Sequence, residues 1–326
     1  MPNQEAQEQI VTDEPASHST RVPLVTFSLG IALLSTFLIA DAFIISPPQQ
    51  QVASAAGARP SELSLDLTAR AVYVYDIAHD RVLYAKNEDT QLPIASITKV
   101  PLVLAVTEVL NPDEEVAISR EAVIEGEGGW IGEGELWKVS DLIEYTLISS
   151  SNVGAVALAE EADDRLRIRN PRSAAGEATV DRMNAIAKEL GLTQTYFLNA
   201  SGLDISETQA GAMGSARDVA HLFAHIAKND TTYFESTAMI QEDLKPLNGD
   251  VKEAENTNDA IPYIPGLVFG KTGTTDLAGG NLAIVFDIGP ARPIAVVVLG
   301  STPDGRYSDM RTIVDAIQEY IAGPIE

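Results

Sequence analysis

The sequence predicts an α+β fold, in which one antiparallel sheet is flanked by helices and a helical subdomain is inserted between its two halves. Short stretches rich in Val, Ile, Phe and Tyr occur near residue 71 and again after residue 267. Between them, apolar residues recur mostly at spacings of three and four, which is the period of an amphipathic helix. A doubly wound parallel sheet would instead alternate strands and helices along the chain, so this order excludes it.

The expected elements follow in order along the chain. A hairpin is predicted over Ala71–Tyr75 and Val82–Tyr84, around the polar turn His79-Asp80. An apolar helix is predicted over Ser96–Leu110. The helical block that follows contains amphipathic segments at Val139–Leu147, Asn152–Ala162, Val180–Leu190 and Ala216–Ala227. Strands and a final helix are then predicted at Leu267–Lys271, Leu282–Asp287, Pro293–Gly300 and Ser308–Ile321.

The composition is that of a folded and strongly acidic protein. Apolar residues make up 45% of the chain, so a sizeable core can form. Lys and Arg number 22 against 47 Asp and Glu, which gives a formal net charge of −25. This charge repels phosphate backbones, so a nucleic-acid partner is excluded. The absence of cysteine excludes disulfides, a thiol nucleophile and Cys-ligated zinc.

The N-terminal segment predicts a membrane anchor. Val22–Ala40 contains no charged residue and, as a helix, spans about 28 Å, close to the thickness of a bilayer core. A cleaved signal peptide stays open as an alternative, because Ala40-Asp41-Ala42 has a small-x-small pattern. We therefore expect a cytoplasmic tail (1–21), a transmembrane anchor or signal segment (22–45), a flexible linker (46–62) and a folded domain (63–326) with its helical subdomain at about 111–212.

Ser96 and Lys99 form the first candidate site, within Ser96-Ile97-Thr98-Lys99. Residues at i and i+3 of a helix share one face, so Lys99 can reach the Ser96 hydroxyl and, when neutral, accept its proton. The extended apolar stretch before them places Ser96 near a helix N-terminus, where backbone N–H groups can polarise a substrate carbonyl. Ser-x-x-Lys alone is common, and a surface helix start is the alternative explanation.

Two further motifs follow in the sequence. Ser150-Ser151-Asn152 lies between two predicted helices, where either serine could instead cap the second helix. Lys271-Thr272-Gly273-Thr274-Thr275 closes a short apolar strand, and Lys-Thr-Gly is rare by chance. Its glycine lets a ligand approach the backbone closely. A candidate site that combines all three motifs is therefore more specific than any one of them.

The ordered motifs resemble those of the serine active-site penicillin-binding proteins and β-lactamases, which share Ser-x-x-Lys, Ser-x-Asn and Lys-Thr-Gly. Longer stretches look like the D-alanyl-D-alanine carboxypeptidases among the low-molecular-mass penicillin-binding proteins. The similarity runs from about Tyr73 to Leu299. The stretches that carry it are Tyr84–Asn87, Arg182–Ala185, Lys188–Leu192, Asn199–Asp204, Ser215–Asp218 and Gly270–Gly280.

The resemblance implies a β-lactamase/DD-peptidase-like fold and a serine-type D-Ala-D-Ala carboxypeptidase that acts on peptidoglycan stem peptides and is acylated by β-lactams. It implies that Ser96 is the nucleophile, Lys99 its general base, and Ser150 the relay of a proton to the leaving D-alanine. The substrate-binding residues that it implies are Asn152, Lys271, Thr272, Gly273 and Thr274, with backbone N–H groups of Ser96 and Thr274 as the oxyanion hole. It implies no metal and no cofactor.

Because peptidoglycan lies outside the cytoplasmic membrane, the resemblance also implies a location. We expect a single-pass protein of the bacterial cytoplasmic membrane with its folded domain on the extracytoplasmic side, or a secreted one if the N-terminal segment is cleaved. The sequence leaves the oligomeric state open.

Other functions remain as alternatives. A DD-endopeptidase of the same family shares these motifs. A β-lactamase needs a deacylating glutamate, and the nearest candidate segment is Glu189–Thr193, which ends in Thr instead of Asn. A non-catalytic wall-binding protein is the alternative from another class.

Two local features qualify the expected site. Pro101, five residues after Ser96, is expected to remove a helical hydrogen bond to the carbonyl of Ile97. Trp130 and Trp137 flank a Gly-rich stretch, Gly126–Gly134, and either line a groove for glycan or peptide or pack within the subdomain.

Overall fold

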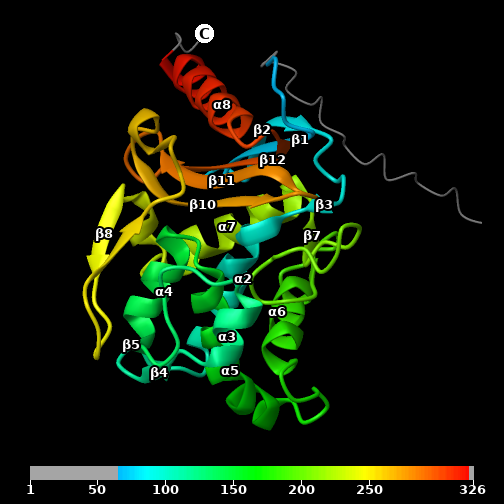
Figure 1. Ribbon diagram of the computed structural model, residues 1–326. Coiled ribbons are helices and arrows are strands. Elements are labelled where there is room, and N and C mark those ends of the chain that lie inside the picture. The colour runs from blue at the N-terminus through cyan, green and yellow to red at the C-terminus, as the bar shows by residue number, and fades with distance from the viewer. Residues whose placement is uncertain (1–64, 323–326) are drawn as a thin grey trace, which may run out of the picture. The chain divides into compact units, whose positions relative to one another are not determined.

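The computed structural model describes residues 65–322, which belong to one compact unit, Ala58–Glu326 (Figure 1). The predicted tail, anchor and linker over residues 1–62 lie outside the described residues. Within residues 65–322, no helix is both long enough and apolar enough to cross a membrane.

The strands are β1 (Ala71–Asp76), β2 (Arg81–Lys86), β3 (Leu92–Pro93), β4 (Glu115–Ala117), β5 (Leu136–Lys138), β6 (Tyr196–Phe197), β7 (Ala212–Gly214), β8 (Gln241–Leu244), β9 (Lys252–Glu255), β10 (Leu267–Thr275), β11 (Gly279–Asp287) and β12 (Pro293–Ser301). The α-helices are α2 (Lys99–Thr107), α3 (Arg120–Glu125), α4 (Val139–Ile148), α5 (Asn152–Arg169), α6 (Ala178–Glu189), α7 (Ala216–Asn229) and α8 (Gly305–Ala322). Short 3₁₀ helices span Ala95–Thr98, Glu235–Ala238 and Ile261–Tyr263.

A five-stranded sheet in the order β10-β11-β12-β1-β2 forms the centre of the fold, and each neighbouring pair is antiparallel. The first two strands of the chain therefore lie in one sheet with the last three, joined by the pairing of β1 with β12, as the sequence predicted. Because β10 stands at one edge, its outer side is free to face other elements. The α+β class and the antiparallel sheet are confirmed.

Both faces of the sheet are buried, and the side chains alternate between two cores. On β12, for example, Val296 and Val298 pack with one core while Val297 and Leu299 pack with the other. Figure 1 shows α8 on one side of the sheet, while α7 and the remaining helices lie on the other. Helix α8 contributes a stripe to its core at the helical spacing of three and four, namely Met310, Ile313, Val314 and Ile317.

Helix α2 passes through the helical side of the molecule and packs against α4, α5 and α6. It is buried on nearly all sides, so Lys99, at its first position, is shielded from solvent. The helix begins at Lys99 and not at Ser96, because residues 95–98 form a tighter 3₁₀ helix. Pro101 therefore lies in the first turn, where backbone N–H groups have no intrahelical partner, and the expected lost hydrogen bond does not arise.

Several short elements were not predicted from the sequence. Strands β3, β7 and β6 form a small sheet, and β8 and β9 form a two-stranded ribbon. They are two to four residues long, too short for a hydrophobic period to appear. The small sheet holds the approach to Ser96, since Ile94 donates from its N–H to the carbonyl of Ala212 at 3.2 Å.

Candidate active site

Ser96 lies in a crowded backbone junction between β3 and α2. The residue before it, Ala95, has a φ of +48°, a left-handed conformation that is unfavourable for a residue with a side chain. Two glycines pack against this junction: a Cβ atom on Gly202 would overlap the carbonyl of Ala95, and one on Gly273 would lie 2.6 Å from the carbonyl oxygen of Ile94. Close packing on both sides therefore fixes the position of the Ser96 backbone.

Lys99 lies directly beside the Ser96 hydroxyl. Its Nζ atom is 2.8 Å from Ser96 Oγ, and it donates to Asn152 Oδ1 at 2.7 Å and to the carbonyl of Ser201 at 2.9 Å. A neutral amine has two N–H donors and one lone pair. In the neutral form these two donors would serve the two carbonyl-type oxygens, and the lone pair would be left for the Ser96 hydroxyl; in the charged form Nζ donates to Ser96 Oγ as well. The contact predicted from the Ser-x-x-Lys spacing is confirmed.

Ser150 and Asn152 come from the turn between α4 and α5. Ser151 is the N-cap of α5, because its Oγ accepts from the Gly154 N–H at 3.1 Å. Ser150 is thereby free for another role, and its φ of +59° turns it out of the helical path. Its Oγ accepts a hydrogen bond from Lys271 Nζ at 2.9 Å. The turn thus places Asn152 at Lys99 and Ser150 at Lys271.

The Lys-Thr-Gly motif lies inside β10 and not at its end, since the strand continues to Thr275. The motif therefore lies along the edge strand of the sheet, where Lys271, Thr272 and Gly273 are buried. Thr272 Oγ1 lies 2.6 Å from Thr257 Oγ1, and Gly273 lies against the Ser96 backbone. The structure therefore brings together all eight site residues predicted from the sequence: Ser96, Lys99, Ser150, Asn152, Lys271, Thr272, Gly273 and Thr274.

With this geometry in place, comparison with known families is decisive. The D-alanyl-D-alanine carboxypeptidase family, peptidase family S11, matches residues 55–302. The chain belongs to this family. The match confirms the resemblance seen in the motifs, and it makes the chain a serine-type hydrolase.

Individual relatives agree with this assignment to the carboxypeptidase family. The D-alanyl-D-alanine carboxypeptidase DacF of Bacillus subtilis is 32% identical over 302 residues, which cover 90% of this chain and 72% of the relative. A D-alanyl-D-alanine endopeptidase of Escherichia coli is 24% identical over 282 residues, 84% of each chain. Penicillin-binding protein D2 from Listeria monocytogenes, solved in an ampicillin-bound form, superposes with a TM-score of 0.64 at 26% identity and covers 78% of this chain and 98% of its own.

Both lysines of this carboxypeptidase-family site are buried, and burial penalises their charged forms. Burial, and next the charge of Lys271, lower the pKa of Lys99 well below its usual value. Burial, and next the charge of Arg306, lower the pKa of Lys271 to about 7. If both lysines were charged, their ammonium groups would repel each other. The site therefore favours a state in which one of the two lysines is neutral.

Residues outside the three motifs complete the site. Arg306 donates from Nη1 to the Gly273 carbonyl at 3.1 Å and contacts Thr274 Oγ1, while its guanidinium stacks 4.6 Å above the Tyr307 ring. The Ser201 carbonyl binds Lys99, and Thr257 binds Thr272. In the sequence, Ser201 stands out only as part of the family-like stretch Asn199–Asp204. Arg306 lies in no motif, because it reaches β10 only when the fold brings the start of α8 to that strand.

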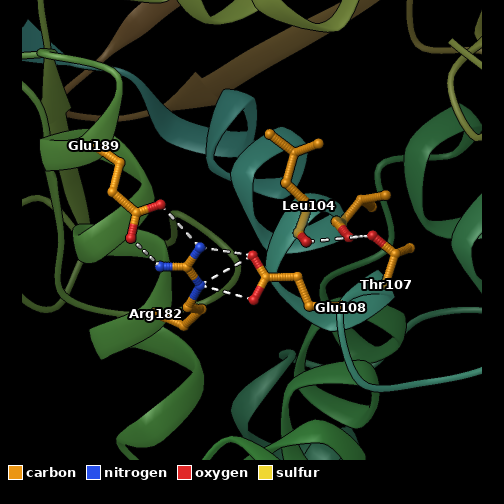
Figure 2. Close-up of polar contacts among 6 residues, drawn as sticks. Leu104, Thr107, Glu108, Arg182 and Glu189 are labelled. Atoms are coloured by element: carbon orange, nitrogen blue, oxygen red, sulfur yellow. Dashed lines mark hydrogen bonds and ion pairs between the residues drawn. The ribbon is translucent and has the colours of Figure 1, made fainter. Parts of the chain in front are cut away.

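Glu189, the candidate β-lactamase base, is directed elsewhere. Figure 2 shows it on the far side of Arg182 from Glu108, so that one guanidinium binds both carboxylates. Arg182 donates to Glu189 at 2.5 Å and 3.0 Å. The hydrogen bonds from Arg182 lower the pKa of Glu189, which makes it a weaker base. The ion pair joins the end of α2 to α6 and has a structural role.

Proposed function

We propose that this protein is a serine-type D-Ala-D-Ala carboxypeptidase that removes the terminal D-alanine from peptidoglycan stem peptides through an acyl-enzyme on Ser96. The observation that carries the proposal is the 2.8 Å contact between Ser96 Oγ and the buried amine of Lys99. A hydroxyl is a weak nucleophile until a neighbouring base removes its proton. Family membership supports the substrate class, and the B. subtilis relative bears the name of the same activity.

The first half of the reaction forms an ester. Neutral Lys99 takes the Ser96 proton while Oγ attacks the carbonyl carbon of the penultimate D-alanine. Backbone N–H groups of Ser96 and Thr274 stabilise the negative oxygen of the tetrahedral intermediate, a contribution of about 3–4 kcal/mol per donor. The C–N bond then breaks as Ser150, held by Lys271, passes a proton to the leaving nitrogen. Water hydrolyses the ester in the second half and restores Ser96.

The substrate is held on both sides of the scissile bond. Asn152 binds the amide of the acyl part, and Thr272 and Thr274 bind the α-carboxylate of the leaving D-alanine. Lys271 and Arg306 supply positive charge at that end, since each contacts one of the two threonines or the glycine between them. A carboxylate among these donors would form charge-assisted hydrogen bonds.

β-Lactams should acylate the same serine, and this gives the direct test. The full-length protein is incubated with excess penicillin and weighed by intact-mass spectrometry, while D-alanine release is measured from a peptide ending in D-Ala-D-Ala. We expect one long-lived adduct on Ser96 and release of D-alanine. Rapid penicillin turnover without an adduct would favour a β-lactamase, and absence of adduct, turnover and D-alanine would favour a wall-binding protein. The ampicillin-bound D2 relative supports the expected adduct.

The pH dependence should report on the two lysines. The rate should rise as Lys99 loses its proton and fall as Lys271 loses its proton, because Lys271 acts as a cation. Removing the neighbouring charge with Arg306→Gln makes charged Lys271 less unfavourable and raises its pKa. We therefore expect the alkaline limb of kcat/KM to move to higher pH in this variant.

The matched control for this measurement is Arg311→Gln, which removes one charge from the same helix, where Arg311 stacks on Tyr263. Its profile should match that of the wild type. An alkaline limb that stays in place in Arg306→Gln would assign that limb to a group other than Lys271.

We also propose that residues 22–45 anchor the protein in the bacterial cytoplasmic membrane, with the folded domain on the extracytoplasmic side. The apolar stretch Val22–Ala40 and the location of peptidoglycan support this proposal. The test is fractionation of cells, followed by protease treatment of spheroplasts. Recovery of the full-length protein from the soluble cytoplasm would overturn the proposal.

A further inference from the structure

Thr257, in the loop that follows β9, joins three elements of the active site. Its N–H donates to the carbonyl of Ile148, the last residue of α4, at 3.3 Å. Its carbonyl accepts from the Tyr307 hydroxyl of α8 at 2.7 Å. Its own hydroxyl lies 2.6 Å from the hydroxyl of Thr272 on β10 and, among the described residues, forms a hydrogen bond only there. The backbone of Thr257 therefore holds the loop, and its side chain serves the Lys-Thr-Gly motif.

The loop around Thr257 is fixed by bonds that do not involve its hydroxyl. Arg306 Nη2 donates to the Tyr307 hydroxyl at 2.5 Å, so the single proton of that hydroxyl is left to donate to the Thr257 carbonyl. The next N–H along the chain, that of Asn258, donates to Asn256 Oδ1 at 2.9 Å. A change confined to the Thr257 hydroxyl therefore leaves the anchors of the loop intact.

The direction of the hydrogen bond between Thr257 and Thr272 decides what Thr272 can offer to a substrate. A hydroxyl has one proton to donate and two lone pairs that accept. Lys271 Nζ donates to Thr272 Oγ1 across a long contact of 3.5 Å, which uses one lone pair. If Thr257 donates to the second lone pair, the Thr272 proton is left for the substrate. If Thr272 donates to Thr257 instead, its proton is used and a lone pair faces the substrate.

Thr274 shows the same arrangement without ambiguity. Arg306 contacts Thr274 Oγ1, and a guanidinium carries only donors, so Thr274 accepts this bond and keeps its own proton for a ligand. Thr272 and Thr274 are two residues apart on β10, so their side chains lie on the same face of the strand. A carboxylate only accepts hydrogen bonds, and it is the ligand that fits two such protons.

We propose that Thr257 is a positioning residue for carboxylate recognition: its hydroxyl donates to Thr272 Oγ1 and thereby directs the Thr272 proton at the α-carboxylate of the leaving D-alanine. This inference rests on the proposed function, because it requires β10 to hold that carboxylate. A C-terminal amide offers one acceptor oxygen and no charge, and its NH₂ group would face the second proton. The orientation that Thr257 imposes therefore selects substrates with a free C-terminal carboxylate.

The test uses the full-length protein and two peptides that differ only at the C-terminus, one ending in D-Ala-D-Ala and the other in the corresponding D-alaninamide. Thr257→Val removes the hydroxyl but keeps the branched shape and the backbone bonds of the residue. We expect kcat/KM for the carboxylate peptide to fall by about tenfold, and that for the amide peptide to stay nearly unchanged. Thr257→Ser keeps a hydroxyl and should restore most of the preference. The control Thr312→Val, at an exposed threonine of α8 that donates to the Ser308 carbonyl, should change neither rate.

Penicillin gives a second measurement, which does not depend on peptide turnover. Its carboxylate should meet the same two threonines, whereas penicillin methyl ester has no charge there. We expect Thr257→Val to slow acylation by penicillin more than acylation by the methyl ester. Thermal unfolding of each variant shows whether a loss arises from the fold.

The outcomes separate this inference from the proposed function. Equal losses for the charged and uncharged ligands would show that Thr257 is only structural, and a Thr257→Ser variant as impaired as Thr257→Val would show that the hydroxyl is not responsible. Either result overturns the inference, as would a wild type that does not distinguish the two peptides. If the wild type neither releases D-alanine nor is acylated by penicillin, the proposed function itself is wrong.

Discussion

Replacement of Ser96 by alanine is expected to lower D-alanine release by about a millionfold, as for removal of a nucleophile in other serine hydrolases. Lys99 Nζ lies 2.8 Å from the Ser96 hydroxyl, whereas the Ser150 hydroxyl is held by Lys271 at 2.9 Å. No other hydroxyl among the described residues contacts Lys99. The variant should also form no adduct with penicillin, which intact-mass spectrometry measures directly.

A serine elsewhere in the helical block provides the matched control for this variant. Ser140→Ala removes a hydroxyl that donates to Asp141 at the start of α4, and it should keep full acylation. A penicillin adduct that persisted in Ser96→Ala would show that another residue is the nucleophile, and Ser150 would be the first candidate. Peptide mapping of the adduct would then identify it.

Replacement of Lys99 by glutamine should produce the second-largest loss, about 10²–10⁴-fold in the rate of acylation. The amide can still donate to the acceptors that Lys99 binds, Asn152 Oδ1 and the Ser201 carbonyl, but it has no basic lone pair for the Ser96 proton. Single-turnover acylation by penicillin, followed over time, measures this step separately from hydrolysis of the ester.

The Lys99→Gln replacement should not lower the stability of the folded protein, although it lowers its activity. Burial lowers the pKa of Lys99 in the folded state, so below its unfolded-state pKa the amine gains a proton on unfolding, which favours the unfolded state. Glutamine removes this contribution, and Tm at neutral pH should be unchanged or higher. The control Lys188→Gln, at an exposed position of α6, should alter neither quantity. An inactive variant with a much lower Tm would show instead that Lys99 has mainly a structural role.

The arrangement of the main sheet was predictable because it follows from local patterns. Strands β1, β11 and β12 are central, are buried on both faces and consist largely of aliphatic and aromatic residues, as strands covered by helices on both sides must be. The helices were predictable because their apolar residues recur at spacings of three and four. Helix α5, however, extends to Arg169, beyond the predicted end at Ala162. Its last residues are mostly charged, so hydrophobic spacing carries no signal there.

The candidate site was predictable to the extent that its chemistry is carried by short motifs. Ser96 and Lys99 are one helical turn apart, so their contact follows from spacing alone. The contact between Lys271 and Ser150 does not, because it depends on β10 standing at the sheet edge against the α4–α5 turn. Arg306 was missed for the same reason, since nothing in its own neighbourhood of the sequence indicates that it reaches Gly273.

The pairing of β1 with β12 has a consequence for biosynthesis. Leu299 is the register partner of Ala71, so the sheet joins segments from opposite ends of the folded domain. Contacts of such long range form late and slow the folding of a domain. On a ribosome or during export, Ser96 and Lys99 emerge long before β10 and Arg306, so a partly synthesised chain has the nucleophile without its substrate-binding wall. Hydrolytic activity therefore cannot begin until nearly the whole domain has been made.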